Sequence, residues 1–369
     1  MPMRIENDIP PPDKVRATRK RTAKVQNPSS QLINALKFVG VIQKKHNYCS
    51  ISGHWAATSN GILTIGHPVE ENLEACPQTF LLIDALTKAT KELSIVQIDS
   101  EVLSISSGAF RALVPCISST QMKITPPDPM TCAVLPSLQN ALGAVAGILL
   151  DEHEREVYTA VLMQSGSSCV ATNGAAILEY WHSSCWQQWD DPEQAMMSPD
   201  FLIPKQAAIA VAKAPYVLVG IGWSDSSVTF HFEGGSFIKT QVYNLDEIIY
   251  PEYNELFATA KLTHKPVPVE LMKAVRAVQT YSEDGHVHFE GTAVQSKQSP
   301  DEASTYRIEG LPSRMAFSAK HLKSVEHAFK SAEFDTIRNL VIFYGDDMPI
   351  RGMLCGVDMP TIGADDIPF

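Results

Sequence analysis

Three groups of residues in this sequence have types and spacings that could carry chemistry. Asp151-Glu-His-Glu154 contains only side chains that bind metals or move protons. In His286-Val-His288, the alternation of a strand would place both imidazoles on one face, as two metal ligands require. Cys169 and Cys185 each follow a serine and could act as nucleophiles.

None of the three groups has the partners that would complete a site. The acidic stretch falls where we expect two strands to turn, which favours a solvated hairpin. No third ligand can be assigned to the histidines, so we expect an exposed strand face there, and neither cysteine has an assignable histidine. Glycine-rich phosphate loops, the dinucleotide fingerprint, H-E-x-x-H and G-x-S-x-G are all absent. We therefore predict a protein that is not an enzyme and that uses no metal or other cofactor.

The composition is that of a soluble globular protein with more than one domain. The 369 residues exceed the usual domain size of roughly 100–200 residues, and 44% of them are hydrophobic. No apolar run is long enough to span a bilayer, so no membrane partner is expected. The seven cysteines are scattered without a C-x-x-C pair, which fits a reducing cytoplasm.

The net charge of −11 argues against a nucleic-acid partner only if the charge is evenly spread. Residues 1–28 carry seven basic residues against three acidic ones and should be a disordered basic tail. Much of the remaining positive charge lies on six segments whose apolar spacing and proline or serine starts predict helices. These are Gln31–Lys45, Pro77–Leu93, Pro136–Leu149, Pro204–Ala214, Pro268–Tyr281 and Ser318–Ala332.

The lysines of single helices share a face, since Lys37 and Lys44 are seven residues apart, as are Lys323 and Lys330. Each face alone could be an ordinary solvated surface. Across the set, however, basic helices and acidic strands and turns would allow the protein to hold a polyanion on one surface.

An internal repeat organises the chain. The order helix, strands, helix, strands occurs three times, and each repeat closes with a predicted hairpin, at Val102–Val114, Val228–Val242 and Leu340–Leu354. Proline-rich joints at 126–129 and 265–268 separate the repeats. We predict three α+β domains, at 29–125, 126–260 and 261–360, between the tail at 1–28 and an acidic tip at 361–369.

Several sequence motifs, spread over the three repeats, resemble motifs of the bacterial DNA sliding clamp, the beta subunit of DNA polymerase III. Val170-Ala-Thr-Asn-Gly174 resembles the family's V-A-T-D-G, and Gly234-Gly235 followed by Tyr250-Pro-Glu-Tyr253 resembles its G-G and F-P-D-Y. The hairpin from Ser106 to Pro115, the stretch Phe317–Leu322 and the closing Asp358-Met-Pro360 resemble further family motifs. The resemblance covers about Ser29 to Pro360, and the divergence elsewhere suggests a phage-encoded or mobile-element clamp.

The resemblance implies a DNA clamp fold of the α+β class. Its three repeated domains pair in a homodimeric ring whose helices line the hole and whose sheets lie outside. Such a ring encircles duplex DNA without reading its sequence and serves as a processivity factor for a replicative DNA polymerase after a clamp loader has placed it. The residues expected to contact phosphates are Lys37, Lys44, Lys45, Lys88, Lys91, Lys205, Lys213, Lys273, Arg276, Lys320, Lys323 and Lys330.

The resemblance also implies an apolar groove that receives short motifs from polymerases and the clamp loader. Carried over by position, the groove would include Thr172, Gly174, Ile177, Pro251, Leu256, Met359 and Pro360. This chain has Ala175-Ala176 where the family usually has His and Arg, and Glu255 where a basic residue is often found. We therefore expect a more apolar and more acidic groove; alternatively, these residues only close the core of the second repeat.

The last residues extend beyond the point where bacterial clamps end. Asp365, Asp366, Ile367, Pro368 and Phe369 resemble the acidic C-terminal tip of the bacterial single-stranded-DNA-binding protein. The terminal Phe and the acidic charges of such a tip dock on an apolar pocket flanked by basic residues. We expect this tip to recruit proteins that bind that tail, unless it is only a frayed acidic end or folds back onto the chain's own groove.

Two further functions stay open from the sequence. The chain could be a clamp-like adaptor or decoy that does not load on DNA but binds host replication proteins. It could also be a three-domain enzyme whose site is assembled from distant residues. The basic tail at 1–28 would either contact DNA or remain solvated.

Overall fold

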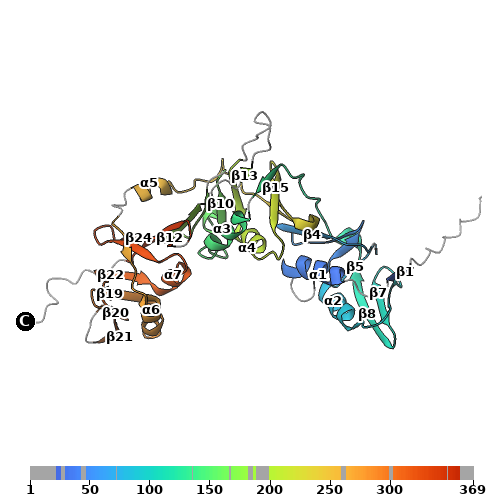
Figure 1. Cartoon of the computed structure of the whole chain (residues 1–369), viewed down its shortest axis with the longest axis horizontal. Coiled ribbons are helices and arrows are strands. Elements are labelled where there is room, and N and C mark those ends of the chain that lie inside the picture. The colour runs from blue at the N-terminus through green and yellow to red at the C-terminus, as the bar shows by residue number, and fades with distance from the viewer. Residues whose placement is uncertain are drawn as a thin grey trace, which may run out of the picture. The chain divides into compact units, whose positions relative to one another are not determined.

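The computed structural model describes residues 30–42, 47–71, 73–134, 136–165, 168–181, 199–258, 263–298, 302–346 and 348–357, and the backbone of two short strands, β1 (Thr22–Val25) and β13 (Trp186–Gln187) (Figure 1). The chain divides into two compact units. The first comprises residues 1–56 and 69–122, and the second comprises residues 57–68 and 123–369. No helix in the described part is long and apolar enough to cross a membrane.

The first unit contains one helix pair and one antiparallel sheet. Helices α1 (Ser30–Val39) and α2 (Thr79–Lys88) pack together, and a 3-10 turn (Gly40–Ile42) extends α1. The strand order is β1-β6-β7-β8-β5, with β5 (Cys76–Pro77), β6 (Leu93–Gln97), β7 (Val102–Ser107) and β8 (Phe110–Ile117). β2 (Ser50–Ser52) also belongs to this unit, as does the start of β3 (Trp55–Ser59). Strand β1 lies within the segment 1–28 that was expected to be a disordered tail. Its backbone pairs with that of β6 and so satisfies the edge of the sheet that β6 would otherwise form.

The second unit contains a sheet with the order β13-β9-β15-β16-β17-β4. Its strands are β4 (Leu63–Pro68), β9 (Cys132–Val134), β15 (Leu218–Ser224), β16 (Ser227–Phe232) and β17 (Phe237–Gln241) together with β13. Residues 57–68 belong to this unit because β4 pairs with β17, with Ile65 opposite Ile238.

The proline-rich joint before β9 is fastened to this sheet. The buried carboxylate of Asp128 accepts hydrogen bonds from the hydroxyls of Ser227 (2.9 Å) and Thr229 (2.8 Å) and forms an ion pair with Lys239 (2.8 Å). Gly222 is required beneath the joint, because a Cβ there would overlap the backbone carbonyl of Pro129. The joint is therefore a packed element of the sheet.

A second sheet of this unit joins the second and third repeats. Its order is β14-β10-β11-β12-β25-β24-β23-β18, so β12 (Ala176–Trp181) of the second repeat pairs with β25 (Ile350–Cys355) of the third. The others are β10 (Ala160–Met163), β11 (Ser168–Thr172), β14 (Phe201–Pro204), β18 (Lys265–Pro266), β23 (Ser331–Asp335) and β24 (Leu340–Tyr344). The third repeat adds a sheet ordered β21-β20-β19-β22, of β19 (His286–Glu290), β20 (Ala293–Gln295), β21 (Thr305–Arg307) and β22 (Ser313–Ser318).

All six expected helices are present, and each is shorter than predicted. In the second unit, α3 (Ser137–Ala146) packs on α4 (Lys205–Ala212), and α6 (Leu271–Gln279) packs on α7 (Ala319–Ser324) (Figure 1). With α1 and α2, these pairs confirm the threefold repeat of helices and the α+β class. The three closing hairpins are also confirmed, as β7–β8, β16–β17 and β24–β25.

The prediction that the last helix runs to Ala332 was wrong. Helix α7 ends at Ser324, and β23 begins at Ser331. The buried residues Val325, Ala328 and Phe329 continue a helical spacing, which explains the error. The backbone N–H of Lys330 instead donates to the carbonyl of Tyr344 (3.1 Å), so the hydrogen bonds pass to the sheet.

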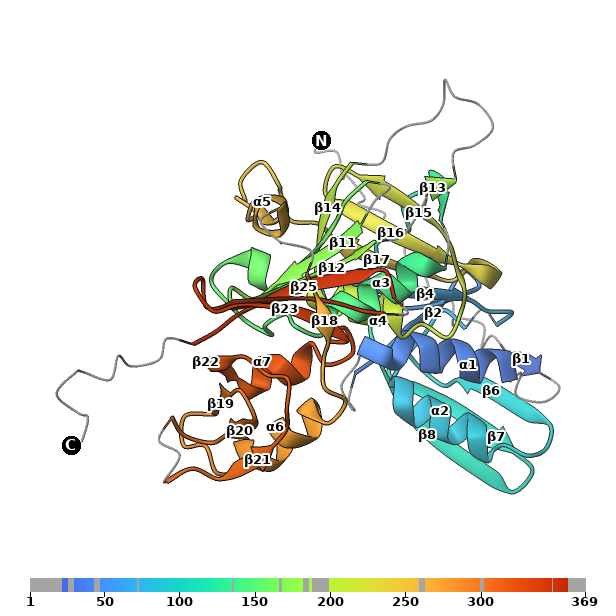
Figure 2. The same ribbon diagram turned by 60° about the vertical axis from the view of Figure 1, so that its left-hand side comes forward.

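A seventh helix, α5 (Tyr253–Ala258), was not predicted from the sequence. With the segment before it, α5 covers one face of the sheet that contains β12 and β25, where Tyr253 and Phe257 are buried against Ile177, Ile342 and Met353. Both ribbon views show α5 on one side of these strands and α7 on the other (Figures 1 and 2). The core of this sheet thus fixes the position of α5.

Candidate functional site

A cavity of about 160 Å³ lies where α5 meets the sheet that joins the second and third repeats. Strand β11 and the turn after it supply Thr172 and Gly174, β12 supplies Ile177, and the α5 segment supplies Pro251 and Leu256. The remaining lining residues are Tyr158, Ala175, Ala176, Met353 and Cys355. None of these side chains carries a formal charge at neutral pH, so the cavity favours an apolar occupant.

The β11–β12 turn forms one wall and has its polar groups satisfied internally. The hydroxyl of Thr172 donates to the carbonyl of Ala176 (2.9 Å), and Asn173 Oδ1 accepts from the N–H of Ala175 (3.0 Å) and of Ala176 (2.8 Å). Gly174 has a φ of 86°, a conformation that other residues rarely adopt, and the ring of Tyr158 lies next to it. The turn therefore presents an uncharged surface to the cavity.

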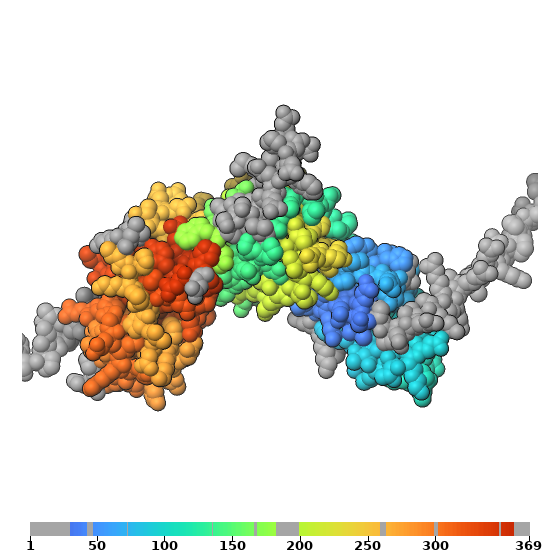
Figure 3. Space-filling view, in the orientation of Figure 1, coloured from blue at the N-terminus to red at the C-terminus, as the bar shows by residue number. Residues whose placement is uncertain are grey.

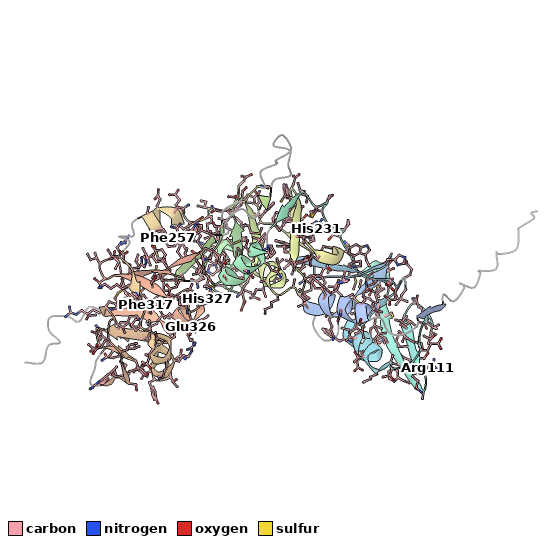
Figure 4. All side chains as sticks on the ribbon, viewed as in Figure 1. Arg111, His231, Phe257, Phe317, Glu326 and His327 are labelled. Atoms are coloured by element: carbon pink, nitrogen blue, oxygen red, sulfur yellow. The ribbon has the colours of Figure 1, made fainter. Side chains whose placement is uncertain are left out.

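Helix α5 forms the facing wall and is held by a cluster of side chains around the half-buried Arg351. The guanidinium of Arg351 lies 4.0 Å from the ring centre of Phe257 and 4.6 Å from that of Trp181, and it pairs with Glu179 at 2.6 Å. The hydroxyl of Tyr253 donates to Gln164 Oε1 at 2.6 Å. Figure 4 labels Phe257 on this helix, and Figure 3 shows the gold surface of the α5 segment beside the red surface of the last strands. These contacts leave Leu256, 42% exposed, at the cavity.

The third wall comes from β25 through pairing with β12. Met353 lies opposite Ile177 in the register, and the N–H of Cys355 donates to the carbonyl of Ala175 (2.8 Å). Cys355 is an exposed residue, but partial desolvation of its thiol raises the pKa of that group, so the wall is neutral here as well. A cavity with walls from both repeats follows directly from the shared sheet.

The ten described cations of the predicted DNA-binding set fall into two groups. Four are in ion pairs: Lys88 with Asp84, Lys205 with Asp151, Lys273 with Glu270 and Arg276 with Glu326. Six are exposed without an ion pair to another described residue: Lys37, Lys91, Lys213, Lys320, Lys323 and Lys330. Lys44 and Lys45 lie outside the described residues.

Three of the six exposed lysines do not lie on helices, which corrects the prediction. Lys91 follows the end of α2, Lys213 is the residue that caps α4, and Lys330 precedes β23. Lys37 on α1, and Lys320 and Lys323 on α7, are helical as predicted. The clustering of basic charge on helices is therefore weaker than the sequence indicated.

The ammonium group of Lys205 is held by contacts within the fold. Its ammonium donates to the carbonyl of Leu149 (2.6 Å) and to Asp151 Oδ1 (2.8 Å), and its side chain is 19% exposed. The hydrogen bond from Lys205 lowers the pKa of Asp151.

The stretch Asp151-Glu-His-Glu154 lies in the loop between α3 and the 3-10 turn Glu156–Tyr158. The expectation that two strands turn there was therefore wrong.

The other chemical candidates remain separate from one another. His288 is 7% exposed on β19, opposite the buried Gln295, so the expectation of an exposed strand face was wrong for this residue. Burial lowers the pKa of His288. Cys169 is buried, Cys185 lies outside the described residues, and no group of three potential metal ligands occurs among the described residues.

Comparison with solved structures identifies the fold. The beta sliding clamp of C. crescentus is 16% identical, with a TM-score of 0.72 over 92% of this chain and 100% of that chain. The DNA polymerase sliding clamp of Bacillus subtilis is 13% identical, with a TM-score of 0.71 over 92% and 99%. The Helicobacter pylori beta clamp, solved with a DNA ligase peptide, is 12% identical, with a TM-score of 0.69 over 92% and 100%. No family model and no curated protein matches the sequence.

The chain has the bacterial sliding-clamp fold. The suspected resemblance to a divergent DNA polymerase III beta clamp is thereby confirmed at the level of the fold.

Within the clamp fold, the structure brings together all five described residues of the predicted groove: Thr172, Gly174, Ile177, Pro251 and Leu256. Met359, Pro360 and the tip residues Asp365 to Phe369 lie outside the described residues. Sequence reasoning missed Tyr158, Met353 and Cys355 as lining residues. The alternation of β25 contains a signal for the last two, because Met353 and Cys355 are two residues apart and face the same side.

Proposed function

We propose that this chain is a DNA polymerase processivity factor, a homodimeric ring that encircles and slides on duplex DNA and tethers replication proteins through the cavity described above. The observation that carries the proposal is the clamp fold over 92% of the chain, with three helix pairs in order along the sequence. The function requires no catalytic residue, since a closed ring is retained on DNA by its topology.

The six exposed lysines support the DNA-binding part of the proposal. They are distributed over the repeats, with Lys37 and Lys91 in the first, Lys213 in the second and Lys320, Lys323 and Lys330 in the third. Exposed ammonium groups bind phosphates without reading bases, which is the weak, sequence-independent contact that sliding needs.

The cavity supports the tethering part. It is apolar, it has walls from two repeats, and it accommodates one aromatic or aliphatic side chain, as a linear motif would present. The Helicobacter pylori clamp was solved with a DNA ligase peptide, and the C. crescentus clamp with polyethylene glycol bound to a putative beta-motif tethering region. By analogy, we expect a replicative polymerase and a clamp loader to bind this cavity. We expect proteins that bind the tail of the single-stranded-DNA-binding protein to bind the tip at 361–369. The protein itself is expected to be cytoplasmic.

The ion pairs favour one alternative, a clamp-like adaptor that binds replication proteins without loading on DNA. Four of the ten described cations of the predicted DNA-binding set already have carboxylate partners, which lowers the positive charge available to phosphates. An adaptor would need the cavity but none of the six exposed lysines.

Retention on circular and linear DNA separates the two functions. The solution mass should be twice 40.5 kDa. With a clamp loader and ATP, the protein should remain on nicked circular DNA and leave after the circle is linearised. Equal retention on both forms would refute encirclement, and a monomer that binds polymerase peptides but never loads would establish the adaptor.

A further inference from the structure

The cavity is neutral, but the segments on either side of it are acidic. On one side, the loop before Tyr158 contains Glu152, Glu154 and Glu156, all exposed. Asp151 of the same loop is paired with Lys205, and the nearby Lys320 also lowers the pKa of Asp151. Arg155 is the one basic residue of this loop, against three glutamates for which the described residues supply no ion pair.

On the other side, α5 and the residue before it carry Glu252 and Glu255. Both are exposed, and they adjoin Pro251 and Leu256, which line the cavity. Arg351 does not neutralise them, because its guanidinium is committed to the buried Glu179 and to the rings of Trp181 and Phe257. We call Glu152, Glu154, Glu156, Glu252 and Glu255 the acidic rim.

The size of the cavity defines what can enter between the two sides. Its volume of about 160 Å³ matches that of engineered apolar cavities of roughly 150 Å³, which hold a benzene molecule. One aromatic side chain therefore fills it, and the residues next to that side chain in a bound peptide come to lie along the acidic rim.

We propose that the cavity binds a linear peptide with an aromatic or aliphatic end and basic residues immediately before it. The inference rests on the proposed function, since it names the partner class of the same groove. Charge complementarity selects such a partner, and like charge disfavours the chain's own tip, whose Asp365 and Asp366 precede Phe369. The acidic rim thus keeps the groove open to other proteins.

A matched pair of labelled peptides tests the proposal on the full chain by fluorescence anisotropy. One peptide is Asp-Asp-Ile-Pro-Phe amide, the sequence of the chain's last five residues, and the other is Lys-Lys-Ile-Pro-Phe amide. A second pair replaces Ile-Pro by Leu-Leu, so that the result does not depend on one apolar end. At about 0.05 M salt the lysine peptides should bind roughly tenfold more tightly, and at about 0.5 M salt the difference should largely vanish.

Variants connect the preference to the acidic rim. Glu252→Gln with Glu255→Gln should remove most of the preference, whereas Asp225→Asn with Glu233→Gln removes two exposed charges around β16, in another sheet, and should leave it unchanged. Leu256→Asp should abolish binding of every peptide, because it places a charge in the cavity wall.

The outcomes distinguish this inference from the proposed function. Equal affinities within each pair at low salt, still lost in Leu256→Asp, would overturn the basic-partner inference and leave the groove in place. Tighter binding of the aspartate peptides would overturn it as well and would make the chain's own tip the occupant. Failure of all four peptides to bind would overturn both the inference and the tethering function.

Discussion

Arg351 is predicted to be the residue on which the position of α5 most depends. It lies on β25 directly opposite Glu179 of β12, so the ion pair connects the strands that join the second and third repeats. The Glu179 side chain is 4% exposed and that of Arg351 is 21% exposed. Replacing Arg351 by Met removes the charge and retains an apolar stem of similar length.

The magnitude follows from the burial of Glu179. Removing one partner of a buried ion pair leaves the other charge uncompensated and costs roughly 3–5 kcal/mol. The lost contacts with the rings of Trp181 and Phe257 are part of this cost, at about 0.5–2 kcal/mol. The double variant Arg351→Met with Glu179→Met should lie within about 1–2 kcal/mol of the native protein, because an apolar pair can replace a buried ion pair at little cost.

Urea unfolding followed by circular dichroism, together with amide hydrogen exchange of β12 and β25, measures these effects. Lys273→Met is the matched control, since its ion pair with Glu270 is 69% and 57% exposed, and it should cost less than about 1 kcal/mol. The Arg351→Met variant should also bind peptides more weakly, because Phe257 is no longer held. A cost below about 1 kcal/mol for Arg351→Met, or a double variant no better than the single one, would refute this account of the cluster.

Three further predictions address other parts of the chain. Burial would raise the pKa of Asp128, but hydrogen bonds from Lys239, Thr229 and Ser227 outweigh it and lower that pKa. The contribution of Asp128 to stability is therefore complete above about pH 4 and is lost as the pH falls through the pKa of the folded protein. In urea unfolding, the free energy of unfolding of Asp128→Asn should fall less steeply at acid pH than that of the native protein. Gly352→Ala should cost about 1–3 kcal/mol, because the new Cβ overlaps Phe343 and Leu178. At Gly147 a new Cβ meets no atom of the described residues within 4 Å, so Gly147→Ala should stabilise the protein by about 0.4–1 kcal/mol; thermal melts compare the two. Replacing Lys320 and Lys323 by Ser should reduce the salt slope of DNA binding by about 1–2, and the same change at the paired Lys88 should leave it unaltered; equal effects would contradict the assignment of the exposed lysines.

The order of helices and hairpins could be predicted from the sequence because each depends on local signals. Apolar spacing marked the helices, and Gly108, Gly234 and Gly345 marked the turns of the three hairpins. Helix ends were less predictable, since Val325 and Phe329 keep a helical spacing after α7 has ended. Helix α5 was missed because six residues give too short a periodic pattern.

The parts of the candidate site that lie in a sequence motif could be predicted, whereas the part formed by the pairing of distant strands could not. The turn after Thr172 and the segment from Pro251 were found from their motifs. The wall made by Met353 and Cys355 depends on the pairing of β12 with β25, which joins residues 170 to 178 positions apart. Ion pairs such as Arg276 with Glu326 depend in the same way on tertiary contacts, so a count of charges in the sequence cannot show which cations already have a carboxylate partner.

The same contrast would allow the clamp fold to persist in chains that differ in the partners they bind. A chain 12–16% identical to solved clamps retains their fold, because a core accepts many apolar residues of suitable volume in the right pattern. The exposed glutamates of the acidic rim make few contacts that the fold requires, so their replacement changes stability little. Their charge nonetheless acts on any peptide that enters the cavity. If the proposed tethering function holds, partner preference can therefore diverge at almost no cost to the fold, and the peptide measurements on the acidic rim test it in this chain.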